Sequence, residues 1–281
     1  EKRAKTFGLI GVAFGLSFFL GNIFVVIFAR NTNNNFIIPV LIASIIPIIN
    51  FLLVFFYLPE TKPNSEINKS KTALKNPLKA LFTVFKEEKI KKLSLAFFIY
   101  FIAFTGLTNI LIFFLQESLN WTTKASSGTL VVVGIIAIIV QGGLIGPLVK
   151  QFGEMRLTLI GSGFILVACA LLITAPKENA TINIYSAVSF LAVGAGLITP
   201  TLRALISKKL DVDKQGSILS NLQGLQSLGG VLGIAMAGRV YDSFGPKSPF
   251  IAGSVILLFM IYLIAEGKNN NSFKNQKLKV F

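Results

Sequence analysis

Long apolar stretches alternate with short polar connections along the whole chain. Eight such stretches lie near residues 6–28, 36–58, 93–115, 127–149, 157–175, 183–206, 216–240 and 249–265. Each is about 20 residues long, which is the length that an α-helix needs to cross the hydrocarbon layer of a membrane. The connections contain Asn, Pro, Lys and Asp, and the stretches lack the alternation over roughly ten residues that is typical of a membrane β-barrel. The pattern therefore predicts an all-α membrane protein with eight transmembrane helices.

The amino-acid composition supports this prediction. Hydrophobic residues make up 53% of the 281 residues, Phe occurs 26 times, and the mean hydropathy is +0.72. A water-soluble protein of this length would not need repeated apolar runs that match the thickness of a membrane. We therefore expect the lipid bilayer to be the environment of the chain.

Basic residues gather on one side of the predicted helices. When successive connections are assigned alternately to two sides, 22 of the 27 Lys and Arg residues fall on the side of both termini. The other side has only Arg30, Lys124, Lys177, Arg239 and Lys247. By the positive-inside rule the basic side faces the cytoplasm, with both termini inside. This topology and attraction to anionic lipid explain the net charge of +15, so no nucleic-acid partner is expected.

The residues that usually carry catalysis or bind metals are scarce. His is absent, Cys169 lies within an apolar run, and no Asp or Glu lies deep in a predicted span. The commonest general base and metal ligand is therefore missing, and no carboxylate cluster replaces it. An enzyme is not expected, and neither a metal nor a cofactor is predicted.

The longest polar segment divides the chain into four regions. Residues 1–58 contain two predicted helices, 59–92 form a cytoplasmic linker, 93–265 contain six helices, and 266–281 form a basic cytoplasmic tail. The linker begins with a flexible composition rich in Pro, Asn, Ser and Lys, and its second part, 76–92, has the spacing of an amphipathic helix on the membrane surface. Because the chain starts at Glu1 with a basic segment that leads into a span, we expect further sequence upstream.

Four segments resemble the major facilitator superfamily, and within it the tetracycline-resistance-type drug:proton antiporters. They are "RAKTFGLIGVAFGLSFFLG" at 3–21, "LPET" at 58–61, "GPLVKQFGEMR" at 146–156 and "GLITPTLRALISKKLDVDKQGSILSNLQGLQSL" at 196–228. The resemblance implies that the eight spans are helices five to twelve of a twelve-helix fold, with the first four absent. It also implies two six-helix bundles around a central cavity that opens alternately to either side.

The resemblance implies a secondary active transporter in the cytoplasmic membrane of a bacterium. Such a protein would export a small amphipathic organic compound or drug, similar to tetracycline, and would couple export to protons in the complete chain. Its partners would be the small-molecule substrate, the lipid bilayer, protons and the missing N-terminal helices of the same protein. The alternative is a truncated or non-transporting membrane protein that acts as a scaffold or as a half that depends on a partner.

The first predicted span corresponds to the helix that carries the antiporter motif of the resembled family. Gly11, Gly15 and Gly21 lie in this span, and Asn22 stands where the family has Pro. A second Gly-Pro of the family, in the penultimate helix, is Gly233-Ile234 here. Both departures remove a proline kink.

Amide side chains inside the spans are the candidates for a substrate cavity, because an amide in lipid without partners costs a few kcal/mol. These residues are Asn50, Asn109, Gln141, Asn221, Gln223 and Gln226. Ordinary hydrogen bonds between helices are the alternative explanation for each of them. As a group, with walls of Phe, they favour a weakly polar cavity for an amphipathic molecule. Arg203, near the inner end of its span, is expected to extend to the lipid headgroups instead of binding substrate.

The charged gap at 146–156 is interpreted as a gating loop on the cytoplasmic side. Gly146 and Pro147 are expected to loosen the end of one helix, and Gly153 to adopt the positive φ of a turn. Lys150 and Arg156 would hold the turn in the cytoplasm, where Glu154 can offset one of them. The loop resembles a degenerate copy of the loop signature of the superfamily, in which Gly146, Leu148 and Gly153 match.

Pairs of glycines four residues apart recur in the spans. They are Gly11 and Gly15, Gly142 and Gly146, and Gly229 and Gly233. Each pair leaves one helix face without side chains, so the backbone of another helix can approach closely. Ordinary membrane packing and a face on which helices slide are both consistent with this pattern.

Overall fold

The computed structural model describes residues 12–13, 15–17, 19–27, 37–57, 81–176 and 179–277, and these ranges contain helices and turns but no strand. The labelled helices are α2 (Ile37–Tyr57), η2 (Phe82–Phe85), α5 (Lys91–Phe113), η3 (Phe114–Ser118), α6 (Thr123–Ile138), η4 (Ile139–Leu144), α7 (Ile145–Phe152), α8 (Glu154–Ile173), α9 (Thr181–Lys208), α10 (Val212–Phe244) and α11 (Ser248–Lys277). The all-α prediction is confirmed.

Six helices in the described part of the chain are long and apolar enough to cross a membrane. They are Val40–Tyr57, Lys91–Ser118, Thr123–Phe152, Glu154–Ile173, Thr181–Lys208 and Ser248–Glu266. A shorter apolar helix covers Gly15–Ile27, within the first predicted span. The remaining predicted span, 216–240, lies inside α10, which is 33 residues long and more polar than the other six. Each of the eight predicted spans therefore overlaps a helix.

The span Thr123–Phe152 is interrupted by a wide turn. Residues Ile139–Leu144 form a π-helix (η4) between α6 and α7. Pro147 is the third residue of α7, so it cannot donate to the carbonyl of Gly143, and its ring pushes that carbonyl away. A π-helical turn next to a missing hydrogen bond is a common way for a helix to absorb such a defect.

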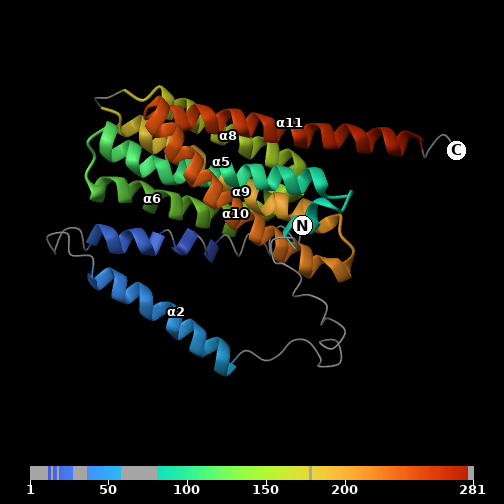
Figure 1. Ribbon diagram of the computed structural model, residues 1–281, viewed down its shortest axis with the longest axis horizontal. Helices are drawn as coiled ribbons and strands as arrows, with labels where there is room; N and C mark the ends of the chain where they lie inside the picture. The colour runs from blue at the N-terminus through green and yellow to red at the C-terminus, as the bar shows by residue number, and fades with distance from the viewer. Residues whose placement is uncertain are drawn as a thin grey trace.

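Helices α5, α6, α8, α9, α10 and α11 run side by side as one bundle (Figure 1). The contact between α8 and α9 is the most extensive, and α5 packs against both α10 and α11. Gly161 of α8 and Gly194 of α9 face each other: a Cβ on Gly161 would lie 2.9 Å from the carbonyl oxygen of Gly194. The two helix backbones are therefore in direct contact at this crossing.

The contact between α5 and α10 uses the predicted glycine pair Gly229 and Gly233. A Cβ on Gly229 would lie 3.2 Å from the carbonyl oxygen of Phe98, and a Cβ on Gly233 would collide with the carbonyl of Ile102. On the opposite helix, a Cβ on Gly106 would lie 2.8 Å from the oxygen of Gly233. The interpretation of Gly229 and Gly233 as a packing face is confirmed.

The other two glycine pairs behave differently. A Cβ on Gly142 would lie 3.0 Å from Val12, whereas one on Gly146 would have open space within 4 Å, so the two do not form one packing face. Gly11 lies outside the described residues. Its predicted partner Gly15 packs on α6, where a Cβ on Gly134 would lie 2.8 Å from the carbonyl oxygen of Gly15.

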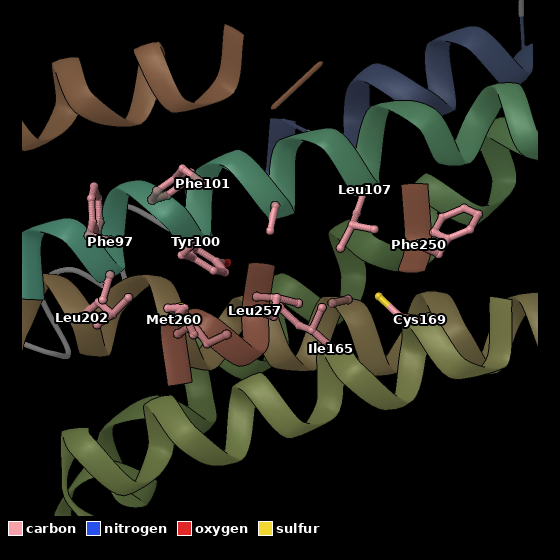
Figure 2. Close-up of a cluster of buried hydrophobic side chains, with 14 of the residues drawn as sticks. Phe97, Tyr100, Phe101, Leu107, Ile165, Cys169, Leu202, Phe250, Leu257 and Met260 are labelled. Carbon is pink, nitrogen blue, oxygen red and sulfur yellow. The ribbon is translucent and has the colours of Figure 1, made fainter. Parts of the chain in front are cut away.

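The core of the bundle is a continuous cluster of buried apolar side chains from α5, α8, α9, α10 and α11. Figure 2 shows Tyr100 and Leu107 of α5 on the side that faces Leu257 of α11 and Ile165 of α8. Cys169 of α8 is fully buried in the same cluster, as expected for a small apolar side chain. This cluster holds the helices on which the cavity described below is built.

Helix α2 lies apart from the bundle and at an angle to it (Figure 1). Its apolar side chains are exposed, including Phe55 and Phe56 at 71% each. Such a surface is stable only against lipid or against other apolar helices. This part of the chain is therefore suited to a membrane and not to water.

The segments on either side of the bundle differ from the sequence prediction in detail. Residues 58–80 of the linker lie outside the described residues. In the rest of the linker, η2 is a single short turn and α5 begins at Lys91, instead of one continuous helix over 76–92. Val84 of η2 is fully buried in the core, so this turn packs against the bundle. At the other end α11 continues to Lys277, so most of the predicted tail is helical.

The glycine crossings predict how α10 responds to single methyl groups. Gly233→Ala should lower the melting temperature of the protein in detergent, since the added Cβ meets the Ile102 carbonyl, at a cost of roughly 1–3 kcal/mol. Gly238→Ala, in the same helix with open space around it, should leave the melting temperature unchanged or raise it. Equal melting temperatures for the two variants would contradict the proposed crossing.

Candidate functional site

A cavity of about 120 Å³ opens between the helix Gly15–Ile27 and the bundle formed by α5, α6, α9 and α10. Most of its lining is apolar, with Phe101, Phe104 and Leu111 from α5 as the largest groups. Its polar lining residues are Thr108, Gln141, Thr199, Arg203 and Gln226. An apolar cavity with a few polar groups at defined places is typical of a binding site for a small molecule.

Arg203 lies inside this cavity and not at the lipid headgroups, so the sequence expectation was wrong. The side chain is 9% exposed and belongs to α9. Its Nη2 donates to Oε1 of Gln223 at 2.7 Å and to Oε1 of Gln226 at 2.5 Å. The two glutamines are three residues apart on one face of α10, and their oxygens hold the guanidinium inside the bundle.

An aromatic ring also contacts the guanidinium. The Arg203 Cζ atom is 5.9 Å from the centre of the Phe97 ring, within the range of a cation–π interaction. One turn along α5, the hydroxyl of Tyr100 shares a hydrogen bond of 3.1 Å with Oγ1 of Thr199, which lines the cavity. Helices α5 and α10 together therefore position the polar face of α9.

Gln141 places a second polar group in the cavity. It belongs to the π-helical turn η4, and its side chain is 8% exposed. Its Oε1 is buried and has no hydrogen-bond partner among the described residues. A buried acceptor without a partner costs about 1–3 kcal/mol, so a donor from a bound molecule would stabilise it.

The six amide candidates from the sequence occupy three kinds of position. Gln141 and Gln226 line the cavity, and Gln223 reaches it through Arg203. Asn109 is exposed and donates to the Thr105 carbonyl of its own helix at 2.9 Å. Asn221 donates to Oγ1 of Thr83 in η2 at 3.1 Å, and Asn50 is exposed on α2. The cavity thus gathers three candidates and adds Arg203, for which the sequence pattern predicts a place at the lipid surface.

The predicted gating loop is a tight turn between α7 and α8. Gly153 has a φ of +75°, as expected for a residue that reverses the chain. Lys150 and Arg156 are exposed, and Gly146 and Pro147 lie in the first turn of α7. Glu154 is buried, at 8% exposure, and pairs with Lys208 at the end of α9.

The partner of Glu154 differs from the one expected, which was Lys150 or Arg156. Helices α8 and α9 are antiparallel and in close contact, so the start of α8 meets the end of α9. An acid at a helix start and a base at a helix end are both favoured by the helix dipoles. The loop is therefore joined to α9 by an ion pair and not closed on itself.

The helix that corresponds to the antiporter motif contributes to the cavity through Gly15. Gly21 has open space within 4 Å, and Asn22 is half-buried. Gly11 lies outside the described residues. Among its described residues, Gly15 is therefore the contribution of this helix to the cavity lining.

Residues 1–234 match the Major Facilitator Superfamily, and the chain belongs to this family. The chain is 23% identical to tetracycline resistance protein class H of Pasteurella multocida over 242 residues, which cover 86% of this chain and 59% of the relative. It is 24% identical over 241 residues to tetracycline resistance protein class C of Escherichia coli, with coverage of 86% and 59%.

A solved structure shares the fold. The crystal structure of the human organic anion transporter MFSD10 (TETRAN) aligns with a TM-score of 0.74 and 20% identity, over 93% of this chain and 63% of the human chain. The mouse protein named Major facilitator superfamily domain-containing protein 10 is 24% identical over 284 residues, which cover 93% of this chain and 59% of the relative. The chain thus spans about three fifths of the length of these relatives.

The family resemblance inferred from the sequence is confirmed by these comparisons. The chain is an integral membrane protein of the superfamily, with homologues among the tetracycline resistance proteins. The structural neighbour, at 20% identity, shows that the described chain shares the superfamily fold. Within the described residues, no group of His, Cys, Asp and Glu is arranged to hold a metal ion.

The ion pair between the loop and α9 leads to a stability prediction. Glu154→Gln should destabilise the protein by about 1–2 kcal/mol, because a largely buried carboxylate loses its contact with a half-exposed lysine. Lys150→Gln, at an exposed residue without an ion pair in the described chain, should have no effect. Thermal melting in detergent measures both.

A double variant tests whether the two charges interact directly. Glu154→Gln combined with Lys208→Gln should melt close to the Glu154→Gln single variant, because the second substitution removes a charge that has already lost its partner. Strictly additive losses would show that the two residues act independently.

Proposed function

We propose that the protein is a secondary active transporter that works by alternating access and exports a small amphipathic organic compound. The cavity between Gly15–Ile27 and the C-terminal helices is the observation that carries the proposal. In the proposed arrangement the cavity would lie where the two halves of a superfamily transporter meet, because Gly15 comes from residues 1–58 and the other lining residues from 93–265. Its apolar walls suit the hydrophobic part of a ligand, and its few polar groups suit an oriented polar end.

The names of the relatives agree with a small organic substrate. Two homologues are tetracycline resistance proteins, and the structural neighbour is an organic anion transporter. Tetracycline and organic anions both combine rings or chains with polar groups. A drug or a similar amphipathic compound is accordingly the substrate class that we propose.

Movement between the halves would occur at the contact between Gly15 and Gly134. A Cβ on Gly134 would lie 2.6 Å from the Phe19 amide nitrogen, so the two backbones touch without intervening side chains. A smooth contact of this kind lets one helix rock on another with little change in packing. Lys150, Arg156 and the pair of Glu154 with Lys208 would lie at the cytoplasmic gate, in the inner membrane of a bacterium with both termini inside.

Proton coupling would require a carboxylate deep in a membrane span, and the described residues supply none there. The described acids of the apolar spans lie near span ends, such as Glu117, Glu154 and Glu266. In the resembled antiporters, coupling acids lie largely in the first four helices. We propose, as the resemblance implies, that export by the complete protein is coupled to protons.

The alternative function is a non-transporting scaffold or a half that depends on a partner. The exposed apolar surface of α2 is the observation that favours it, since this surface could bind another membrane protein. The two functions differ in one measurable property. A transporter moves substrate across a sealed membrane, whereas a scaffold does not.

Flux through proteoliposomes tests the proposal. The protein, with any coding sequence that precedes residue 1 retained, is reconstituted with an imposed pH gradient, and tetracycline accumulation is followed by fluorescence. We expect accumulation that stops when the gradient is dissipated. Accumulation no faster than in empty liposomes, for tetracycline and for a panel of fluorescent amphiphiles, would support the scaffold function.

Filling the cavity should block transport. Ala195→Phe adds an aromatic ring to the cavity wall and should lower the transport rate at least about tenfold, with little loss of stability. Val255→Phe, at a residue of α11 that is 61% exposed, should transport as the unaltered protein does. Equal transport rates for the two variants would show that the substrate does not pass through the cavity.

Thiol labelling tests the orientation in the membrane. The single cysteine, Cys169, is fully buried and should not react with a membrane-impermeant maleimide. Lys150→Cys should be labelled only from the cytoplasmic side and Lys124→Cys only from the outside, because these exposed residues lie at opposite ends of Thr123–Phe152. The reverse pattern would invert the proposed topology.

A further inference from the structure

Arg203 is a buried cation without an acidic partner in the described part of the chain. Its side chain is 9% exposed. The ion pairs among the described residues join Lys92 to Glu266, Lys208 to Glu154 and Lys214 to Glu87. A charge removed from water is costly unless an opposite charge or several hydrogen bonds compensate it. The described residues therefore leave the charge of Arg203 unneutralised.

The hydrogen bonds of Arg203 leave donors available for a ligand. Both recorded bonds start from Nη2 and end on the neutral amide oxygens of Gln223 and Gln226. A guanidinium carries five N–H groups, and those on Nη1 and Nε have no acceptor among the described residues. Because Arg203 lines the cavity, an anion that enters could accept from these donors.

A second ligand contact lies farther along the same face of α9. Gly196, Thr199 and Arg203 all line the cavity and follow the spacing of one helix face. A Cβ on Gly196 would lie 3.6 Å from Cγ of Gln141, so the unpartnered Oε1 of Gln141 belongs to this end of the cavity. The helix rise from Gly196 to Arg203 separates the two ends by about 10 Å.

Most of the remaining cavity lining is apolar. Phe101, Phe104 and Leu111 of α5 belong to this apolar lining. A ligand that matches the whole surface carries a negative group at one end, a ring system or chain in the middle, and an N–H or O–H donor at the other end. A cationic ligand would be repelled by Arg203, with no acid in the described cavity lining to offset the repulsion.

We propose that the cavity binds organic anions, with the anionic group on Arg203 and a donor group on Oε1 of Gln141. The conclusion that a bound anion is exported rests on the proposed transport function. The binding site itself is inferred from Arg203, its glutamine partners and the cavity. Gln223 and Gln226 are positioning residues: they orient the guanidinium without neutralising it. The anion supplies the counter-charge that the described residues lack.

Equilibrium binding to the full chain tests the site. The purified protein is placed in nanodiscs of phosphatidylcholine, and the fluorescence anisotropy of two dyes is titrated at neutral pH. Fluorescein and rhodamine 123 share a xanthene ring system, but fluorescein is an anion and rhodamine 123 a cation. We expect fluorescein to bind at least about tenfold more tightly.

Two variants address Arg203 in different ways. Arg203→Gln removes the charge and should weaken fluorescein binding at least about tenfold. Gln226→Glu keeps Arg203 but gives it an adjacent carboxylate, which should weaken fluorescein binding to a similar extent while maintaining or raising the melting temperature. Asn221→Asp adds the same charge to α10 outside the cavity, beside Thr83, and should leave fluorescein binding unchanged.

The outcomes separate the site from the transport function. Equal affinity for the two dyes, or unchanged fluorescein binding in Gln226→Glu, would overturn the anion site even if Arg203→Gln fails to fold. If anions bind in a way that depends on Arg203 but no flux is seen in proteoliposomes, the anion site is supported and the export function is rejected. If Arg203→Gln and Gln226→Glu leave the flux unchanged, the protein exports its substrate without using the anion site. The export function would then stand and the anion site would be rejected.

A lipid headgroup presents the same anionic chemistry as a soluble anion. The titration is therefore repeated in nanodiscs that contain phosphatidylglycerol, with Arg203→Gln as the control for repulsion between the dye and the charged lipid surface. Phosphatidylglycerol should lower the fluorescein affinity of both proteins by repulsion. If Arg203 binds soluble anions, this decrease should be no larger for the unaltered protein than for Arg203→Gln. A larger loss in the unaltered protein would assign the site to a lipid phosphate and overturn a soluble ligand.

Discussion

The close approach of helix backbones at glycines is the constraint on which the rest of this structure depends. Helices in lipid gain little from burying apolar surface against one another, so packing contacts and hydrogen bonds must hold them together. Gly161 meets Gly194 between α8 and α9, and Gly233 meets Gly106 between α10 and α5. These two crossings hold α8 against α9 and α10 against α5, and the cavity is the space left where the helix Gly15–Ile27 joins the bundle.

The cavity combines this close packing with an unusual charge. Arg203 is held by two amides of α10 and by the ring of Phe97, so its position depends on the same helix contacts that the glycines set. The structure thereby keeps a cation away from both water and lipid. Its polar contacts come from helices that are packed firmly together, whereas the described residues of the helix Gly15–Ile27 line the cavity through Gly15.

The sequence predicted the positions of the helices better than the side-chain contacts between them. Apolar runs of membrane length located the helices, and the spacing of Gly229 and Gly233 located one crossing, because both properties are local. The burial of Arg203 could not be read in this way, since it depends on acceptors 20 and 23 residues away. The same holds for Glu154, whose partner Lys208 is 54 residues distant and competes with two nearer cations. The sequence contained one indication of the Arg203 contact: two glutamines three residues apart in one span, and an arginine inside the span before it.

The π-helical turn Ile139–Leu144 lets one span serve two different neighbours. A wide turn takes up an extra residue, so the faces of α7 are rotated by about 100° from those an uninterrupted α6 would present. Before the turn, Gly134 faces the helix Gly15–Ile27; after it, Val149 joins a separate small cluster with Leu157 of α8 and Ala204 of α9. The span therefore acts as two short helices, one packed against the helix Gly15–Ile27 and the other against α8 and α9.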